Sequence, residues 1–398
     1  MPRPSPMNLS PLPALRRPPL HACTGLRFFA ALGVVAYHFY CPPCEPSGPS
    51  FLANLFQAGF TTVSLFFILS GFILAYNYLG ERGGFVGTLG DFYRARFARI
   101  YPIYLLALVV DLPLFVHWIR QANPAATPGE VAHISVTTLT LTQSWLELGR
   151  PTWNNMAWTL SAEAFFYALF PFLGLWLSRQ RSGRLVFIAV GAWLLGASFA
   201  VAAELVPTLA ADASLVERGL YTWSQLPLQL IPPTRLPEFV LGMCLGLLFC
   251  RRTTPGSESR RTVALFGTFG VLIALLLWLP PKPSPLVQMG VLVPLFALII
   301  WLLAGGVAWQ GLKLGSRPLV LLGGASYALY LLHGSMMNYA LALNTRSLSL
   351  PHNAVALLLV PVAVAVSILL FHRLEEPARG WLRHMGRSRR LAKTEGVR

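Results

Sequence analysis

Long apolar stretches recur along this chain at the length that a membrane span requires. Ten of them are roughly 17 to 24 residues long and lie at about 25–41, 57–79, 101–119, 157–178, 184–204, 235–250, 262–280, 286–308, 318–341 and 353–372. Another stretch, 131–146, is rich in threonine and less apolar. The pattern predicts an all-α, polytopic membrane bundle of about ten transmembrane helices. Residues 120–156 are expected to form a long outer segment that dips into or lies on this bundle.

Composition agrees with a polytopic membrane protein. Hydrophobic residues make up 55% and charged residues 12% of the 398 positions, and the mean hydropathy is +0.58. A soluble chain carries about twice this share of charge. The first 25 residues lack the continuous apolar core of a cleaved signal peptide. We therefore expect a cytoplasmic N-terminal segment at 1–24, one membrane domain at 25–372 and a basic cytoplasmic tail at 373–398.

The basic residues are distributed as the positive-inside rule requires. With ten spans and a cytoplasmic N-terminus, 24 of the 31 Lys and Arg residues fall on the cytoplasmic side and six fall outside. A full span at 131–146 would invert every later loop and destroy this asymmetry. The net charge of +16 is therefore explained by topology, and we expect the lipid bilayer, not nucleic acid, as the partner of this charge.

The first predicted span, which contains Leu26 to Tyr40, holds two ionisable residues, Arg27 and His38. They are separated by almost three helical turns, so they lie on one face roughly 16 Å apart along the axis. Ionisable side chains inside a membrane helix indicate function by default. In the alternative interpretation, Arg27 reaches the cytoplasmic interface and His38 is an interfacial or hydrogen-bonded core residue.

A second group of arginines stands at the cytoplasmic end of the third span. Arg96 and Arg99 are spaced i, i+3, so their guanidiniums project from one helical face and suit phosphate oxygens. Arg27 is predicted at the same membrane depth. The alternative is an ordinary basic anchor against lipid headgroups.

The fourth and sixth spans carry the next polar residues. Glu163 is predicted inside the fourth span, preceded by Asn154 and Trp158, and a carboxylate at this depth is costly against lipid. We consider two interpretations: Glu163 orients a histidine, or Glu163 pairs with Arg235. Arg235 also has Glu238 at i+3, and these two side chains can satisfy each other.

Two further features leave alternatives open. Ser326, Tyr330 and His333 form one polar stripe along the ninth span, which serves either the site or helix packing. Cys41 and Cys44 flank two prolines just beyond the first span, where they either form a disulfide or stay free thiols.

An ordered set of motifs resembles the acyltransferase-3 family of integral-membrane O-acyltransferases. These motifs are LRFFAALGVVAYHF, VSLFFILSGFILA, FYRARFARIYPIY, WTLSAEAFFYALFP, RLPEFVLGM, SYALYLLH and RLEEPAR. The resemblance runs from about Leu26 to Arg379. The family's Arg–His pair matches Arg27 and His38, its RxxR motif matches Arg96 and Arg99, and its acidic residue matches Glu163. The esterase-like SGNH domain of many relatives has no counterpart here, so the chain looks like a standalone member.

The resemblance implies an acyl-CoA donor, with acetyl-CoA the expected form, and a hydroxylated acceptor such as a sugar, a polysaccharide or a macrolide-like metabolite. The donor phosphates would contact Arg96, Arg99 and Arg27. The 16 Å to His38 is roughly the length of a pantetheine arm. His38, with an ordinary pKa near 6.5, would be the general base, and Glu163 or Tyr330 would fix its tautomer.

The remaining candidates are substrate contacts at five positions: Trp158, Asn154, Arg235, Tyr330 and His333. Direct transfer and an acyl-histidine intermediate both stay open. No metal is expected, because the histidines lack a second His or Cys at ligand spacing. The resemblance also implies the inner, cytoplasmic membrane of a bacterium.

Two other classes compete with the enzyme. A transporter or flippase would use the same polar groups to line a path, but no inverted repeat or pair of broken helices is evident. A catalytically silent sensor or scaffold is the other class. Both would leave an acyl-CoA thioester intact.

Overall fold

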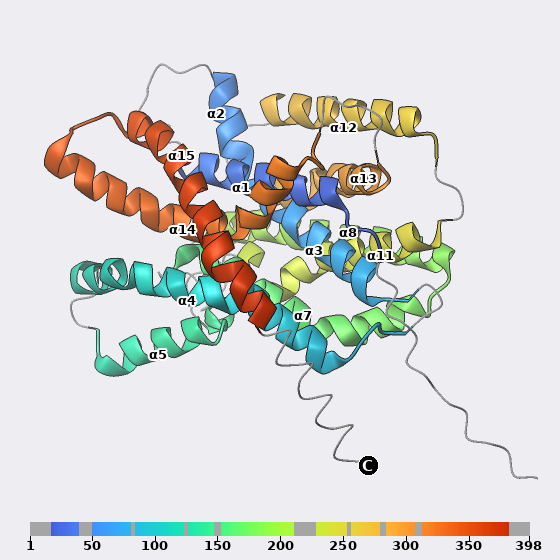
Figure 1. Ribbon diagram of the computed structural model, residues 1–398, viewed down its shortest axis with the longest axis horizontal. Coiled ribbons are helices and arrows are strands. Elements are labelled where there is room, and N and C mark those ends of the chain that lie inside the picture. Colours follow the sequence, from blue (N-terminus) through green and yellow to red (C-terminus); the bar gives the residue numbers. More distant parts are fainter. Residues whose placement is uncertain are drawn as a thin grey trace, which may run out of the picture.

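The computed structural model describes residues 17–39, 50–80, 84–122, 126–146, 153–210, 228–252, 256–278, 284–306 and 313–381. Within these ranges the chain folds into helices joined by short connections (Figure 1). The β-structure of these ranges amounts to one isolated bridge between Leu79 and Phe85. Ten helical stretches there are long and apolar enough to cross a membrane, and each coincides with one predicted span. The predicted all-α polytopic bundle is confirmed.

The helices have the following bounds. They are α1 (His21–Phe39), α2 (Ser50–Gln57), η2 (Ala58–Thr61), α3 (Thr62–Tyr78), α4 (Leu89–Ala122), α5 (Pro128–Leu139), α6 (Gln143–Leu146), η3 (Asn155–Ala157), α7 (Trp158–Ser178), α8 (Ser182–Ala210), η4 (Leu228–Leu230), α11 (Pro232–Arg251), α12 (Glu258–Trp278), the π-helical turn η5 (Val287–Val291), α13 (Val293–Ala304), α14 (Arg317–Ser347), α15 (His352–Leu370) and the π-helical turn η6 (Phe371–Glu375).

Glycines let two pairs of helices approach each other backbone to backbone. On α3 and α11, a Cβ added at Gly71 would overlap the Phe239 carbonyl, and one added at Gly242 would overlap that of Ile68. On α14, a Cβ at Gly323 would overlap the Thr24 carbonyl of α1. Small residues at such contacts are how membrane helices gain close packing without a hydrophobic driving force. The α1–α14 contact joins the helices that carry His38 and His333.

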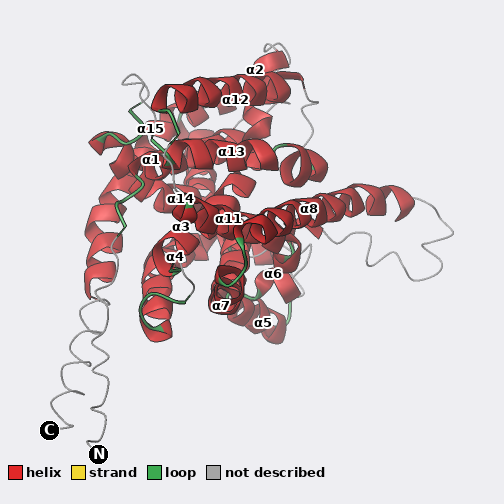
Figure 2. Cartoon of the chain, turned by 90° about the vertical axis from the view of Figure 1, so that its right-hand side faces the viewer, coloured by secondary structure: helices red, strands yellow, loops and turns green. Residues whose placement is uncertain are grey.

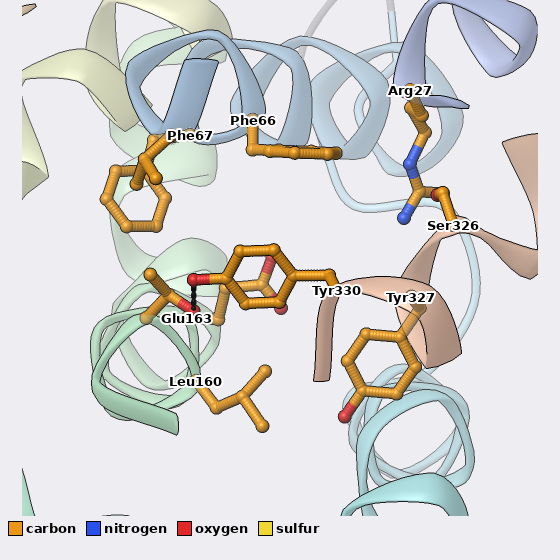
Figure 3. A pocket seen from close by; sticks show the side chains of 10 residues that line it. Arg27, Phe66, Phe67, Leu160, Glu163, Ser326, Tyr327 and Tyr330 are labelled. Atoms are coloured by element: carbon orange, nitrogen blue, oxygen red, sulfur yellow. Dashed lines mark hydrogen bonds between the residues drawn. The ribbon is translucent and has the colours of Figure 1, made fainter. Parts of the chain in front are cut away.

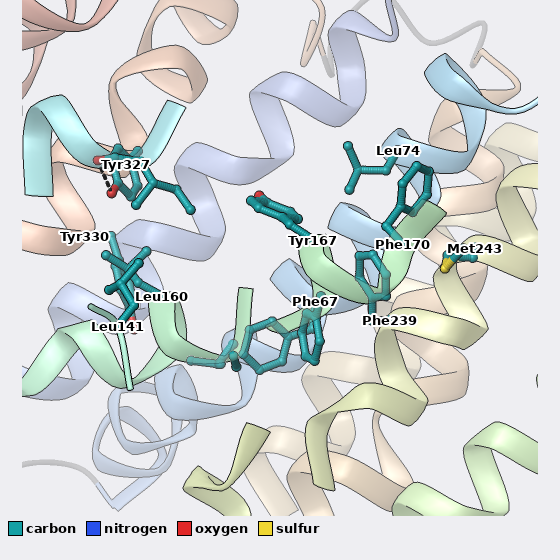
Figure 4. Packing of buried hydrophobic residues seen from close by; sticks show 14 of the residues in the cluster. Phe67, Leu74, Leu141, Leu160, Tyr167, Phe170, Phe239, Met243, Tyr327 and Tyr330 are labelled. Carbon is teal, nitrogen blue, oxygen red and sulfur yellow. Dashed lines mark hydrogen bonds between the residues drawn. The ribbon is translucent and has the colours of Figure 1, made fainter. Parts of the chain in front are cut away.

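Aromatic side chains fill the centre between α3, α7 and α11 (Figure 4). The Phe166 ring stacks on that of Phe239 with 4.8 Å between centroids, and Phe67 meets Phe166 edge to face at 5.2 Å. All three side chains are buried. Close packing here fixes α7, and therefore Glu163, relative to α3.

Three helices, α8, α12 and α15, lie at the periphery of the bundle (Figure 2). Several of their large apolar side chains are exposed. Phe187 is 80% exposed, Trp278 is 84% exposed and Leu357 is 75% exposed. Surfaces of this kind are stable against hydrocarbon but not against water. The exposed belt thus supports the assignment of a membrane-integral bundle.

The threonine-rich segment forms two short helices, α5 and α6, neither long enough to cross a bilayer. Tyr104, midway along α4, donates a 2.6 Å hydrogen bond to the Thr138 carbonyl, and Ser161 of α7 donates one of 2.6 Å to the Leu141 carbonyl. Leu141 turns the chain with a φ of 59°. The segment therefore dips into the bundle to the level of Tyr104, which is one of the two placements expected for it. The side of the membrane from which it enters stays a prediction.

Some predictions about organisation are not tested. Cys41 and Cys44 lie outside the described residues. The division at 24 and 372 also stays a prediction. The helical stretch that begins at His352 continues to Trp381, and Glu375 within it is completely buried.

Candidate functional site

Three parts of the chain bring four arginines to one end of the bundle. Arg27 comes from the second turn of α1, Arg96 and Arg99 from the beginning of α4, and Arg379 from the helical stretch after η6. Arg379 is close enough to the other three to interact with them electrostatically. We call these four residues the arginine cluster.

Glu375 is the carboxylate at the centre of the arginine cluster. Its side chain is 0% exposed and forms ion pairs with both Arg99 and Arg379. The Arg99 guanidinium also lies 4.9 Å from the centroid of the Tyr327 ring, and its Nη2 is buried without a hydrogen-bond partner among the described residues. A buried carboxylate is tolerated only when it is paired, which explains why two arginines converge on it. One donor of Arg99 remains available.

Arg96 lies among aromatic rings. Its guanidinium carbon is within 5.9 Å of the ring centroids of Tyr78, Phe92 and Tyr167, and Nη2 donates a 3.4 Å hydrogen bond to the Tyr78 hydroxyl. The side chain is partly exposed. Cation–π contacts hold a guanidinium without neutralising it, so Arg96 keeps its full positive charge.

Arg27 points into a small cavity of about 40 Å³ between α1, α3, α7 and α14 (Figure 3). Glu163 and Tyr330 line the same cavity. Arg27 has no hydrogen bond or ion pair with any described residue, whereas Glu163 accepts a 3.1 Å hydrogen bond from the Tyr167 hydroxyl. A guanidinium without a partner inside a bundle is costly, and a ligand anion would relieve that cost.

The reacting histidine predicted from the sequence, His38, contacts a second histidine. Nε2 of His333, on α14, lies 3.1 Å from Nδ1 of His38, on α1. Nδ1 of His38 also lies 2.9 Å from the Val34 carbonyl, and Nδ1 of His333 lies 2.6 Å from the Tyr330 carbonyl. His333 is completely buried, but His38 is exposed.

These partners fix both tautomers. A carbonyl oxygen only accepts hydrogen bonds, so each Nδ1 carries the proton in the neutral ring. Nε2 of His333 then has a lone pair that accepts from Nδ1–H of His38. The remaining nitrogen, Nε2 of His38, carries a lone pair and has no hydrogen-bond partner among the described residues. Such a nitrogen is available to take a proton.

His38 lines a second cavity of about 230 Å³, which adjoins that of Arg27. Val63 and Tyr330 form part of the wall of both cavities. Tyr330 is held in place by a 3.0 Å hydrogen bond between its hydroxyl and that of Thr159. The cavities of Arg27 and His38 therefore meet at Val63 and Tyr330.

The other predicted site residues are distributed over three places. Trp158 lines the His38 cavity. Asn154 instead donates a 2.5 Å hydrogen bond to Asp111 and lines a third cavity. Arg235 is completely buried, pairs with Glu238 at 3.1 Å and donates to the Ser64 hydroxyl at 3.0 Å. It lines none of these three cavities.

The positions of Glu375 and Arg379 in the arginine cluster were not predicted from the sequence. Both belong to the RLEEPAR motif, whose paired opposite charges at i, i+4 immediately follow an apolar span. That motif was the available signal. Partners of His38 were also missed. The Nδ1 contacts come from Val34 and His333, not from Glu163 or Tyr330.

The fold and these cavities define a multi-pass membrane protein in which an arginine, Arg27, and an exposed histidine, His38, line adjoining cavities. Comparison with known proteins identifies the family. Residues 20–372 match the model of the acyltransferase-3 family, described as an acyltransferase domain. The chain belongs to this family and is a membrane O-acyltransferase.

Curated relatives cover most of the chain. Acyltransferase MdmB of Streptomyces mycarofaciens is 32% identical over 94% of this chain and 94% of its own length. Putative peptidoglycan O-acetyltransferase YrhL of Bacillus subtilis (strain 168) is 23% identical over 89% of this chain and 54% of its own length. Nodulation protein 10 of Rhizobium leguminosarum bv. viciae is 23% identical over 80% of this chain and 83% of its own length. No solved structure matches the chain significantly.

Proposed function

We propose that the protein transfers an acetyl or other short acyl group from acyl-CoA to a hydroxyl of a sugar, glycan or secondary metabolite, with His38 as the general base. The observation that carries this proposal is the orientation of His38 by Val34 and His333, which leaves Nε2 basic and unpartnered among the described residues. The peptidoglycan in the name of the Bacillus relative supports a glycan acceptor. Because the relatives are bacterial, we also propose the cytoplasmic membrane as its location.

The arginine cluster suits the phosphates of the donor. Arg27 has no hydrogen bond or ion pair among the described residues and interacts with Glu163 and Glu375 only at longer range. Arg96 retains its charge among aromatic rings, and Nη2 of Arg99 is a spare buried donor. Guanidinium forks bind phosphate oxygens with charge-assisted hydrogen bonds. Because Arg99 already forms an ion pair with Glu375, we assign the main phosphate contact to Arg27 and supporting contacts to Arg96 and Arg99.

The transfer step follows from the tautomer of His38. Nε2 of His38 removes the proton of the acceptor hydroxyl while the oxygen of that hydroxyl attacks the thioester carbonyl. The new C–O bond forms, the C–S bond breaks, and the CoA thiolate takes the proton back from the imidazolium. Val34 O and Nε2 of His333 both accept from Nδ1–H, so they stabilise the transient imidazolium. The products are an ester and free CoA.

An acyl-histidine route would use the same lone pair of His38 as a nucleophile. Single-turnover experiments with labelled acyl-CoA and no acceptor separate the two routes. Label retained on the protein after rapid quenching indicates the acyl-enzyme, whereas unlabelled protein indicates direct transfer.

The function itself is tested with protein reconstituted in nanodiscs, acetyl-CoA and a mixture of hydroxylated acceptors. We expect release of the CoA thiol that depends on acceptor and an acetylated product detected by mass spectrometry. A transporter or a scaffold would be favoured instead if acetyl-CoA stayed intact under all conditions while the acceptor was bound or transported.

A further inference from the structure

A third cavity, of about 350 Å³, lies beside α14 on a different face from His38. Leu331, Gly334 and Asn338 form its α14 wall at helical spacing, and α4 and the residues around η3 form the rest. Tyr330 and His333 point from the other face of α14 toward the His38 cavity. The third cavity is therefore separate from the reaction site.

Three aromatic rings line this cavity. Phe115 and Trp153 stack with centroids 4.9 Å apart and an angle of 6°, and Trp153 Nε1 donates a 2.9 Å hydrogen bond to the Leu108 carbonyl. Trp118 is partly exposed, lines the cavity and makes no ring contact or hydrogen bond with the described residues. Two rings are thus fixed in place and one is open to a ligand.

Polar groups share the cavity with these rings. Asp111 is only 4% exposed and accepts hydrogen bonds from Asn154 and from the Ser335 hydroxyl. A carboxylate has about four acceptor positions, so it retains capacity beyond these two bonds. Asn338 is exposed and has no hydrogen bond with the described residues. An acidic residue at this depth of a membrane helix indicates a functional site.

We propose that this cavity binds one sugar ring of the acceptor. The apolar CH face of a pyranose packs on an indole ring, and its hydroxyls donate to a carboxylate and exchange hydrogen bonds with an amide. Trp118 supplies the face, and Asp111 and Asn338 supply the polar contacts. The proposal rests on the proposed function, because it assigns a substrate class to that reaction.

The third cavity adjoins the His38 cavity at one residue. Met156 lines both, and its methyl group packs beside Gly334. Methionine is unbranched and adapts readily to its neighbours. An acceptor with two linked rings therefore places its reacting hydroxyl beside His38 and its second ring beside Trp118, with the Met156 side chain between them.

Binding is tested directly by saturation-transfer NMR on the full chain in nanodiscs, without acyl-CoA. The probes are the methyl pyranosides of glucose, galactose, mannose and rhamnose, and cyclohexanol serves as an apolar ring of similar size. We expect saturation transfer from the protein to the protons of at least one glycoside. Trp118→Ala should weaken it about fivefold, and Trp118→Phe should restore most of the signal. Asn338→Ala should weaken it about threefold.

Matched controls keep this result specific. Trp176→Ala removes an exposed indole of α7 outside this cavity, and Asn77→Ala removes an exposed amide of α3. Both should leave the glycoside signal unchanged. The proposal is overturned if no glycoside is saturated, if Trp118→Ala and Trp176→Ala give equal signals, or if cyclohexanol binds with the same dependence on Trp118.

The outcome does not depend on the reaction. His38→Ala should retain glycoside binding even where it abolishes transfer. A protein that transfers acetyl groups to a simple alcohol yet binds no glycoside would refute the sugar site alone. A protein that binds glycosides but never consumes acetyl-CoA would refute the proposed donor instead.

Discussion

His38 and His333 share a hydrogen bond although 295 residues separate them in the sequence, with Nε2 of His333 3.1 Å from Nδ1 of His38. The contact exists because α1 and α14 pack closely where Gly323 meets the backbone of Thr24. His333 is buried and its own Nδ1 is fixed by the Tyr330 carbonyl. We interpret it as the residue that positions His38.

His333→Leu should therefore lower turnover by about tenfold, the value of one hydrogen bond to a transiently charged group, with little effect on the acceptor KM. His333→Gln should recover part of this loss, because its amide oxygen can accept from Nδ1–H of His38. The measurement is steady-state acetyl transfer at saturating acetyl-CoA.

His117→Leu is the control for this change, since His117 is an exposed histidine on α4. It should behave as wild type. Equal turnover of the Leu and Gln variants at position 333, both folded by thermal shift, would show that the hydrogen bond to His38 does not matter.

Glu375 should be essential for stability, because its loss leaves two guanidiniums without their carboxylate. Removing one partner from a buried ion pair costs about 3–5 kcal/mol. Glu375→Gln should therefore lower the Tm of the protein in detergent by several degrees. Glu376→Gln is the neighbouring control, since Glu376 is exposed and pairs only with His372 among the described residues. Equal Tm values for the two variants would contradict this account.

Arg27 should contribute most to donor affinity. Arg27→Ala should weaken CoA binding by about 10- to 150-fold, as expected for a lost charge-assisted hydrogen bond, and Arg27→Lys should weaken it less because charge is kept but the fork is lost. Arg96→Ala and Arg99→Ala should weaken CoA binding more than acceptor binding. Isothermal titration with CoA gives these affinities.

The exposed Arg184 of α8 provides the control for the donor site. Arg184→Ala should leave the CoA affinity unchanged. If Arg27→Ala and Arg184→Ala bind CoA equally well, the arginine cluster is a membrane anchor and not a phosphate site.

Much of the fold is predictable from local sequence, because a membrane helix must satisfy its backbone internally and must be apolar over a fixed length. The spans follow from that rule, and the absence of a full span around Thr138 follows from the charge asymmetry of the loops. The pairing of Arg235 with Glu238 is equally local, since the residues are i, i+3 neighbours on one helix.

Long-range contacts in the site were not predictable in this way. His38 meets His333, and Arg99 meets Glu375, only because of how α1, α4, α14 and η6 pack. Periodicity within one helix contains no information about which other helix it faces. The sequence indicates that Arg27 and His38 are functional, because burying an ionisable side chain in an apolar helix costs free energy. It does not indicate that His333 contacts His38 or that Glu375 pairs with Arg99.

The topology prediction concerns orientation. Both termini should be cytoplasmic and residues 120–156 should be on the outer side, as the charge asymmetry indicates. In a background with Cys41, Cys44 and Cys250 replaced by serine, an impermeant maleimide should label Asn123→Cys in intact cells. Ser182→Cys should be labelled only after permeabilisation. Labelling of position 182 but not 123 in intact cells would refute the ten-span arrangement.

The central claim is that His38 performs the chemistry, and His38→Ala tests it most directly. Turnover is measured at saturating acetyl-CoA and acceptor, beside CoA titration and a thermal-shift check of folding. We expect CoA affinity and Tm near wild type but a loss of about 10²–10⁴ in turnover, because a general base acts mainly in the transition state. His38→Gln should fail almost as badly, since an amide cannot accept the proton. A folded His38→Ala protein with near wild-type turnover would contradict the mechanism and make Glu163 or His333 the candidate base.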